Sequence, residues 1–256
     1  MYRFILFFLI APLLLLAYVD SDMDGVEDKN DRCPNTAMTD LVDLSGCTIE
    51  RLVSPHHFSV MAGATYANDK ENTYNFSSLE FDYYYKEISV QFSTSYYDLE
   101  SSTLNKEGMN DSYLNLFYKF NPSKNFSLNL GTGLVLPTYD NVNNKVDYAT
   151  SIYGRYALDK WSLSAGLGYT FVGDVNASNR RFYNVSTGYS WNNNFYSSIG
   201  YYVSESIYEG INDFESLSLY NYYSINQNWF TTVSFTQGLN DVSLDNSVGV
   251  KLGYYW

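Results

Sequence analysis

Apolar and polar residues alternate along most of the chain that follows His57. From Trp161 to Phe171 every second residue is apolar, and the residues between them are Ser, Gly and Thr. A period of two is typical of a β-strand with one apolar face. The pattern recurs at 88–96, 126–136 and 246–256. The sequence therefore predicts an all-β domain.

The alternating segments predict an antiparallel sheet of about 12 strands. We expect these strands at 57–67, 74–85, 88–98, 112–121, 125–137, 146–157, 160–171, 182–191, 195–205, 214–225, 229–237 and 246–256.

The connections between the predicted strands alternate in length. Tight turns are expected at 86–87, 121–124, 158–159, 192–194 and 226–228, and longer acidic or Asn-rich loops at 99–111, 138–145, 172–181, 206–213 and 238–245. The second face of each strand carries small polar residues and few charges. Both features favour a transmembrane, up-and-down β-barrel whose apolar face meets lipid. The alternative is an exported soluble β-sandwich, but a sandwich does not need so many alternating strands.

If the apolar positions face lipid, residues of the opposite parity line the lumen. Six charged residues have this parity: Glu80, Asp82, Lys119, Asp147, Arg155 and Lys251. Mixed charges inside a barrel form either a salt-bridged plug or the lining of a narrow polar channel. The last strand ends in an apolar series at alternate positions, Leu252, Tyr254 and Trp256. This series resembles the carboxy-terminal signal by which outer-membrane assembly machinery recognises barrel proteins.

Composition narrows the classes of function. The 256 residues include 28 Asp and Glu against 15 Lys and Arg, a formal net charge of −13. We expect no nucleic-acid partner, because phosphate binding needs a basic surface. Barrel enzymes resemble one another in using an acid–base His, whereas the two His here, His56 and His57, lie at the entry of the first strand. We therefore expect no enzyme.

The chain begins with the features of a secretory signal peptide. Arg3 precedes the apolar run 4–16, and Ala17 is a suitable cleavage position. A retained membrane helix is the alternative, but a spanning helix needs roughly 20 apolar residues. An exported chain would meet an oxidising compartment. We divide the sequence into a signal peptide at 1–17, an acidic module at 18–50, a linker at 51–56 and the barrel at 57–256.

The acidic module spaces its carboxylates like a calcium-binding loop. Asp20, Asp22, Asp24, Asp28 and Asp31 hold positions one, three, five, nine and twelve of such a loop, and Val26 at position seven offers its backbone carbonyl. Gly25 holds position six, where the loop turns sharply. Unlike an EF-hand, the segment has Asp31 instead of Glu at position twelve and no flanking amphipathic helices. The alternative is a solvated acidic linker.

Residues 20–47 closely resemble a thrombospondin type 3 repeat. The similarity covers the series of Asp residues, Cys33-Pro34, Val42-Asp43 and Gly46-Cys47. The resemblance implies calcium held by the Asp ligands and a disulfide between Cys33 and Cys47. A unit this small cannot build a hydrophobic core, so we expect the metal and the disulfide to stabilise it.

A second resemblance concerns the barrel. The stretch LGTGLVLPT at 130–138 is similar to the outer-membrane barrel family assigned to transport in phenol-degradation pathways. We predict a passive, porin-like channel for small solutes in the outer membrane of a Gram-negative bacterium, with the calcium-binding module in the periplasm. The alternative is a non-conducting structural or adhesion protein with calcium-dependent contacts. The expected partners are outer-membrane lipid, lipopolysaccharide and the barrel assembly machinery.

Overall fold

The computed structural model describes residues 20–22, 26, 28–36, 42, 45–47, 56–70, 72–101, 105–141, 143–208 and 210–256. The predicted signal peptide and Asp24 lie outside these residues. The chain divides into two compact units, Met1–Val53 and Ser54–Trp256.

The second unit is a closed antiparallel barrel of twelve strands, as predicted. A thirteenth strand, β4 (Asn105–Met109), lies outside the ring and pairs with the end of β3. The barrel strands are β1 (His56–Asp69), β2 (Asn72–Tyr85), β3 (Ile88–Glu100), β5 (Ser112–Ser123), β6 (Phe126–Leu136), β7 (Asp147–Leu158), β8 (Trp161–Phe171), β9 (Arg180–Asn192), β10 (Phe195–Ser204), β11 (Phe214–Ser224), β12 (Trp229–Gly238) and β13 (Asn246–Tyr255).

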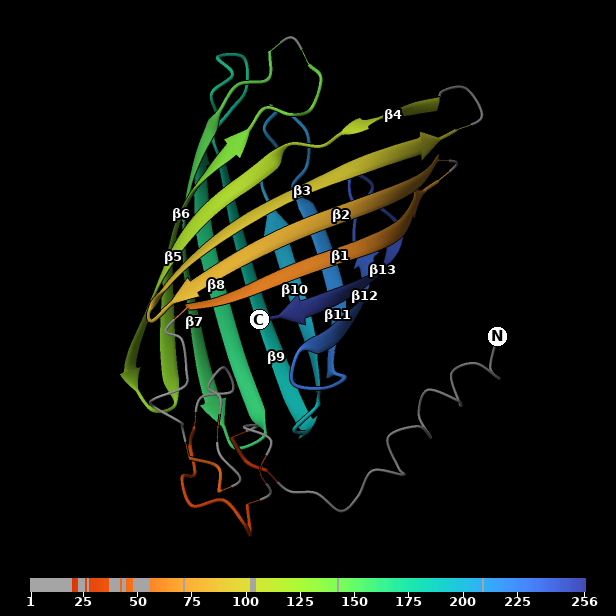
Figure 1. The fold of residues 1–256 in the computed structure, drawn as a ribbon. Coiled ribbons are helices and arrows are strands. Elements are labelled where there is room, and N and C mark those ends of the chain that lie inside the picture. The colour runs from red at the N-terminus through yellow and green to blue at the C-terminus, as the bar shows by residue number, and fades with distance from the viewer. Residues whose placement is uncertain are drawn as a thin grey trace, which may run out of the picture. The chain divides into compact units, whose positions relative to one another are not determined.

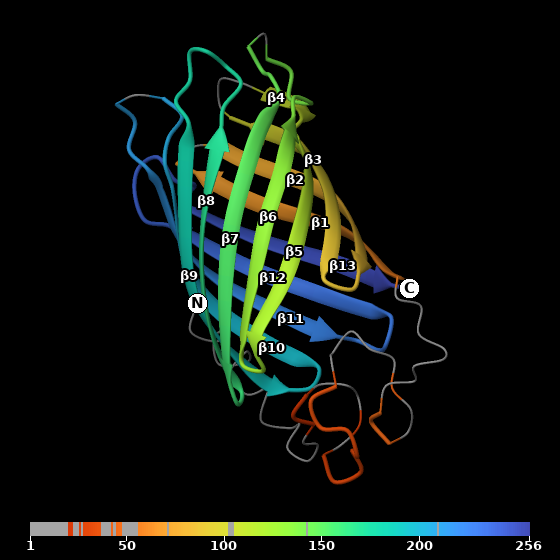
Figure 2. The same cartoon turned by 90° about the vertical axis from the view of Figure 1, so that its left-hand side faces the viewer.

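Each barrel strand pairs with its neighbours along the chain, and β1 pairs with β13 to close the ring. Figures 1 and 2 show β5–β9 on one side of the barrel, and β1, β2 and β10–β13 on the other. The turns at 86–87, 124–125, 159–160, 193–194 and 225–228 lie at one end, which we call the short-turn end. The other end, the long-loop end, has connections at 70–71, 101–111, 137–146, 172–179, 205–213 and 239–245.

β4 corrects the sequence-based expectation for residues 99–111, where we predicted a loop throughout. Its pairing with β3 begins with Tyr96 opposite Met109, whereas β3 pairs with β5 up to Ser93 opposite Tyr113. The pairing therefore shifts by one residue between these points, as at a β-bulge. The segment NKEGM is polar and does not alternate, so periodicity did not reveal this strand.

The two faces of the barrel wall differ in the way the alternation predicts. Large apolar side chains such as Leu163, Leu167 and Ile199 are more than half exposed on the outer face. The inner face carries buried small polar residues, among them Ser59, Ser162 and Thr170. Among the described residues, only Ala67, Tyr97, Val135 and Phe230 are buried hydrophobic residues. An apolar core therefore does not fill this barrel, as expected for a wall that faces lipid outside and a polar lumen inside.

All four Trp residues of the chain lie on the outer face at the short-turn end: Trp161, Trp191, Trp229 and Trp256. Their neighbours include Tyr189, whose ring centroid is 4.8 Å from that of Trp161, and Tyr254, which is 4.9 Å from Trp229. Trp and Tyr are enriched where a membrane meets water. This band therefore marks one membrane interface. In the part of the chain that the structure describes, no helix is long and apolar enough to cross a bilayer.

The N-terminal unit contains the Cys33–Cys47 disulfide that the thrombospondin resemblance implied, with the two Cα atoms 5.0 Å apart. The backbone N–H of Arg32 donates to the carbonyl of Ser45 over 2.8 Å. Thr36 Oγ1 lies 2.8 Å from the carbonyl oxygens of both Cys33 and Gly46, which share its one proton. The disulfide and these polar contacts hold the two cysteine-containing segments side by side.

Candidate functional site in the barrel lumen

The strand register assigns each residue to a face, because directly paired residues share one side of a sheet. Asp82 pairs with buried Ser59 on β1 and with Gln91 on β3. Followed around the barrel in this way, the register places all six predicted charges on the inner face: Glu80, Asp82, Lys119, Asp147, Arg155 and Lys251. Arg180 of β9, which pairs with Thr170, shares this face. The sequence-based boundary at 182 left Arg180 in a loop and so missed it.

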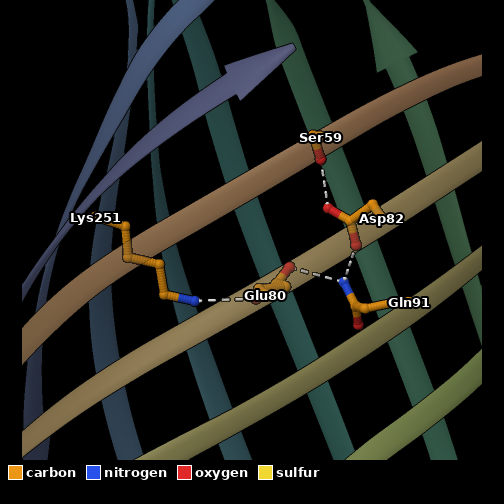
Figure 3. A network of polar contacts seen from close by, with 5 residues as sticks. All are labelled: Ser59, Glu80, Asp82, Gln91 and Lys251. Atoms are coloured by element: carbon orange, nitrogen blue, oxygen red, sulfur yellow. Dashed lines mark hydrogen bonds and ion pairs between the residues drawn. The ribbon is translucent and has the colours of Figure 1, made fainter. Parts of the chain in front are cut away.

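Glu80, Asp82 and Lys251 belong to one polar network (Figure 3). Lys251 Nζ lies 3.2 Å from Glu80 Oε2. Gln91 Nε2 donates to Glu80 Oε1 over 2.8 Å and to Asp82 Oδ1 over 3.0 Å. Ser59 Oγ donates to Asp82 Oδ2 over 2.6 Å. Among the described residues, Lys251 thus pairs with Glu80 alone, and hydrogen bonds from Ser59 and Gln91 satisfy the more deeply buried carboxylate, Asp82, which is 4% exposed.

Gly63 makes the ion pair between Lys251 and Glu80 possible. The two residues lie on β13 and β2, and Gly63 of β1 stands between them opposite Lys251. A Cβ atom on Gly63 would lie 2.5 Å from Lys251 Cγ and 2.7 Å from the carbonyl oxygen of Val250. The side chain of Lys251 therefore crosses β1 through space that only glycine leaves open.

Other inward glycines accommodate aromatic rings from neighbouring strands. A Cβ on any of five glycines would overlap a ring: Phe117 at Gly131, Tyr153 at Gly166, Phe182 at Gly168, Tyr196 at Gly188 and Phe230 at Gly253. Four of these rings belong to the residue directly opposite the glycine. The rings therefore lie against the barrel wall, where they take up less of the lumen than rings pointing to the barrel axis would.

The remaining predicted charges do not join the network around Glu80. Asp147 accepts a hydrogen bond from the backbone N–H of Gly173 over 2.8 Å, at the long-loop end. The guanidinium carbon of Arg155 lies 5.8 Å from the ring centroid of Tyr196. Lys119 is exposed on β5. The six charges therefore do not form one continuous salt-bridged plug among the described residues.

In the acidic module, side-chain carboxylates accept hydrogen bonds from backbone N–H groups. Asp22 Oδ2 accepts the N–H groups of Asn35 and Thr36 over 2.7 and 2.6 Å. Asp28 accepts both the N–H and the hydroxyl of Ser21, over 2.6 and 2.7 Å, and Asp31 accepts the N–H of Cys33 over 2.8 Å.

Among the described residues of this module, one buried carboxylate oxygen has no hydrogen-bond partner. Asp22 Oδ1 is buried and receives no hydrogen bond in the structure. A buried unpartnered carboxylate oxygen is compatible with a cation ligand. Among the described residues, however, no three His, Cys, Asp or Glu side chains converge as a metal-binding group. Asp24, the ligand expected at position five, is outside the described residues.

Comparison with known proteins agrees with the barrel architecture. A family model described as "Putative MetA-pathway of phenol degradation" matches residues 51–243. Among solved structures, an outer membrane channel from Pseudomonas putida F1 is similar with a TM-score of 0.65, at 11% identity over 78% of this chain and 95% of that chain. The NanC porin has a TM-score of 0.52, at 11% identity over 77% of this chain and 98% of its own. The KdgM porin has a TM-score of 0.50, at 14% identity over the same shares of the two chains. No curated protein matches the chain.

Proposed function

This chain belongs to the MetA phenol-degradation family, and from that family and its fold we propose that it is a passive, porin-like channel for small solutes in the outer membrane of a Gram-negative bacterium. The observation that carries the proposal is the inner face of the closed barrel. It is lined by Ser, Thr, Gly and charged residues, with aromatic rings laid against the wall. A wall of this kind leaves a polar path for solutes.

Single-channel conductance of the refolded protein in a planar bilayer tests this function. We expect discrete openings whose ion selectivity responds to changes in the inward charges. Heat-modifiable mobility in gel electrophoresis confirms folding in the same sample. A folded protein that never conducts contradicts the channel and favours the non-conducting structural or adhesion function.

We also propose that residues 20–31 bind calcium through Asp20, Asp22, Asp24, Asp28, Asp31 and the carbonyl of Val26. The support is the ligand spacing together with the unpartnered Asp22 Oδ1. Calcium titration by calorimetry should show binding that Asp22→Ala combined with Asp24→Ala abolishes, while the barrel stays folded. Unchanged affinity in the double variant would show that these side chains are not the ligands.

The location of the two units belongs to the same proposal. The even number of barrel strands puts both barrel ends, at His56 and Tyr255, on the short-turn side, which is periplasmic in outer-membrane barrels. The N-terminal module would then also be periplasmic. The barrel's lipid-facing surface fits outer-membrane lipid and lipopolysaccharide as neighbours. Its last strand fits recognition by the assembly machinery through Leu252, Tyr254 and Trp256. Protease digestion of intact and permeabilised cells tests the orientation, because a periplasmic module is cut only after permeabilisation.

A further inference from the structure

Within the described residues, Lys119 and Arg155 differ from two other cations of the barrel in having no carboxylate partner. Lys251 pairs with Glu80 on the inner face, and Arg181 pairs with Glu205 over 2.7 Å on the outer face. In the described part of the chain, neither Lys119 nor Arg155 takes part in an ion pair. Both side chains are exposed and both lie on the inner face. Unpaired cations on the wall of a pore attract anions.

The register brings these two cations to neighbouring positions near the short-turn end. Lys119 of β5 lies opposite Asn129 of β6, and Arg155 of β7 lies opposite Ser127 of the same strand. Since only β6 separates them and adjacent strands are about 4.8 Å apart, the two backbones lie roughly 10 Å apart across the sheet. Both cations therefore raise the positive potential over the small polar residues Ser127 and Asn129 of β6.

Contacts with the wall hold Arg155 in place. Its guanidinium lies over the ring of Tyr196, whose centroid is 5.8 Å away. The ring of Tyr196 lies in the space left by Gly188, and its hydroxyl is 3.1 Å from Oγ of buried Ser162. This arrangement orients the guanidinium before any ligand arrives, which lowers the entropic cost of binding.

Tyr153 provides an aromatic surface beside the two cations. It lies on the same face of β7 as Arg155, two residues earlier, and pairs with Asn129. Two residues of strand correspond to roughly 7 Å along the strand axis. The ring of Tyr153 lies against Gly166 on β8. A ligand whose carboxylate meets Arg155 can therefore place an attached ring against Tyr153, one step deeper in the lumen.

From this geometry we propose that Lys119, Arg155 and Tyr153 form a lumenal subsite for organic anions that carry a carboxylate on a ring. The inference rests on the proposed channel function and names the class of solute that the channel favours. The planar guanidinium binds a carboxylate through two parallel hydrogen bonds, and Lys119 adds a second positive charge. Aromatic acids and sugar acids share this chemistry.

Calorimetric titration of the refolded protein in detergent tests the subsite with benzoate, glucuronate and acetate as probes. We expect at least one of the two ring acids to bind, and to bind more tightly than acetate, which has no ring. Lys119→Gln combined with Arg155→Gln should weaken that binding by about tenfold or more, because charged hydrogen bonds are lost. Lys124→Gln combined with Lys160→Gln is the matched control, since it also removes two positive charges, from the exposed short turns that follow β5 and β7.

The pattern of binding decides between outcomes. Binding of benzoate alone assigns the subsite to aromatic acids, and binding of glucuronate alone assigns it to sugar acids. Absence of binding, equal binding of acetate, or unchanged affinity in the folded double variant overturns the subsite. Calorimetry does not depend on conduction, so the two proposals can fail separately. A protein that conducts but binds neither ring acid contradicts only the subsite. A protein that binds a ring acid but does not conduct contradicts only the channel function.

Discussion

At the scale of single residues, Gly63 controls whether Lys251 reaches Glu80. Gly63→Ala places a methyl group against both the Lys251 side chain and the Val250 carbonyl, so a side chain or the backbone must shift. We expect a loss of about 1–3 kcal/mol in barrel stability, the usual cost of overpacking. Urea unfolding in lipid vesicles measures the change. Gly154→Ala is the control, because its nearest contact would be an ordinary 3.4 Å. Equal effects of the two substitutions would contradict a specific role for Gly63.

Lys251 also balances the charge of its network. Lys251→Met leaves Glu80 and Asp82 without a nearby cation, so the lumen near β2 becomes more negative. We expect the reversal potential in a salt gradient to shift toward cation selectivity, since charged groups on a pore wall set its selectivity. Lys251→Arg keeps the charge and should retain wild-type selectivity. An unchanged reversal potential in Lys251→Met would mean that ions do not pass close to this network.

Sequence periodicity assigns a residue to a face but does not identify its partner. The inward position of Glu80 and Lys251 follows from counting along each strand. Their contact depends on which strands close the barrel, on the register between β13 and β1, and on Gly63. None of these is visible in the alternation of one strand. The unpaired state of Arg155 and its contact with Tyr196 depend on three-dimensional neighbours in the same way.

At the scale of elements, the salt bridge between Arg181 and Glu205 connects the loop at 205–213 to β9. The Arg181 guanidinium donates to Glu205 Oε1 over 2.8 Å, and the Arg181 N–H donates to Oε2 over 2.9 Å. The Glu205 N–H returns a hydrogen bond to the Arg181 carbonyl over 2.9 Å. These donors hold the pKa of the Glu205 carboxyl below its usual value of 4.5.

A lowered pKa in the folded state gives the pH dependence a definite sign. The contact stabilises the loop fully above the unfolded pKa, and the stabilisation is lost as the pH falls through the lowered folded value. We expect amide hydrogen exchange in 205–213, corrected for its intrinsic rate, to be constant near neutral pH and to accelerate only below about pH 4.5. Glu205→Gln should remove this acid step. An acid step of the same size in the variant would assign the effect to another carboxyl group.

Elements with strong alternation were predictable, and β4 was not. All twelve barrel strands were located to within about two residues, because one face must meet lipid over the whole span. β4 lies beyond the ring, where neither of its faces needs to be apolar. A hydrogen bond from Lys106 Nζ to the Tyr139 hydroxyl, over 2.7 Å, connects it to the loop at 137–146. Its position is therefore set by backbone pairing with the end of β3 and by a contact with this loop, and neither leaves a periodic pattern in the sequence.

At the scale of the whole molecule, the band of Trp161, Trp191, Trp229 and Trp256 defines how the barrel sits in a bilayer. The four residues lie at the short-turn end and point outward, so one membrane interface should hold all of them. The long-loop end has Tyr and Phe residues on its outer face, such as Tyr66, Tyr148 and Phe171. Tryptophan fluorescence therefore reports on a single interface of this barrel.

In vesicles of brominated lipid, we expect bromine placed close to the head groups to quench this fluorescence more than bromine at the chain ends. The physical reason is that an indole ring prefers the depth at which its N–H group remains near water and its apolar face meets the acyl chains. Replacing the four Trp with Phe one at a time should lower the emission without changing the ratio of the two quenching efficiencies. A ratio that differs between the single variants would mean that the rings lie at different depths. The barrel axis would then be tilted from the membrane normal, so that the short-turn end would not lie level with one membrane interface.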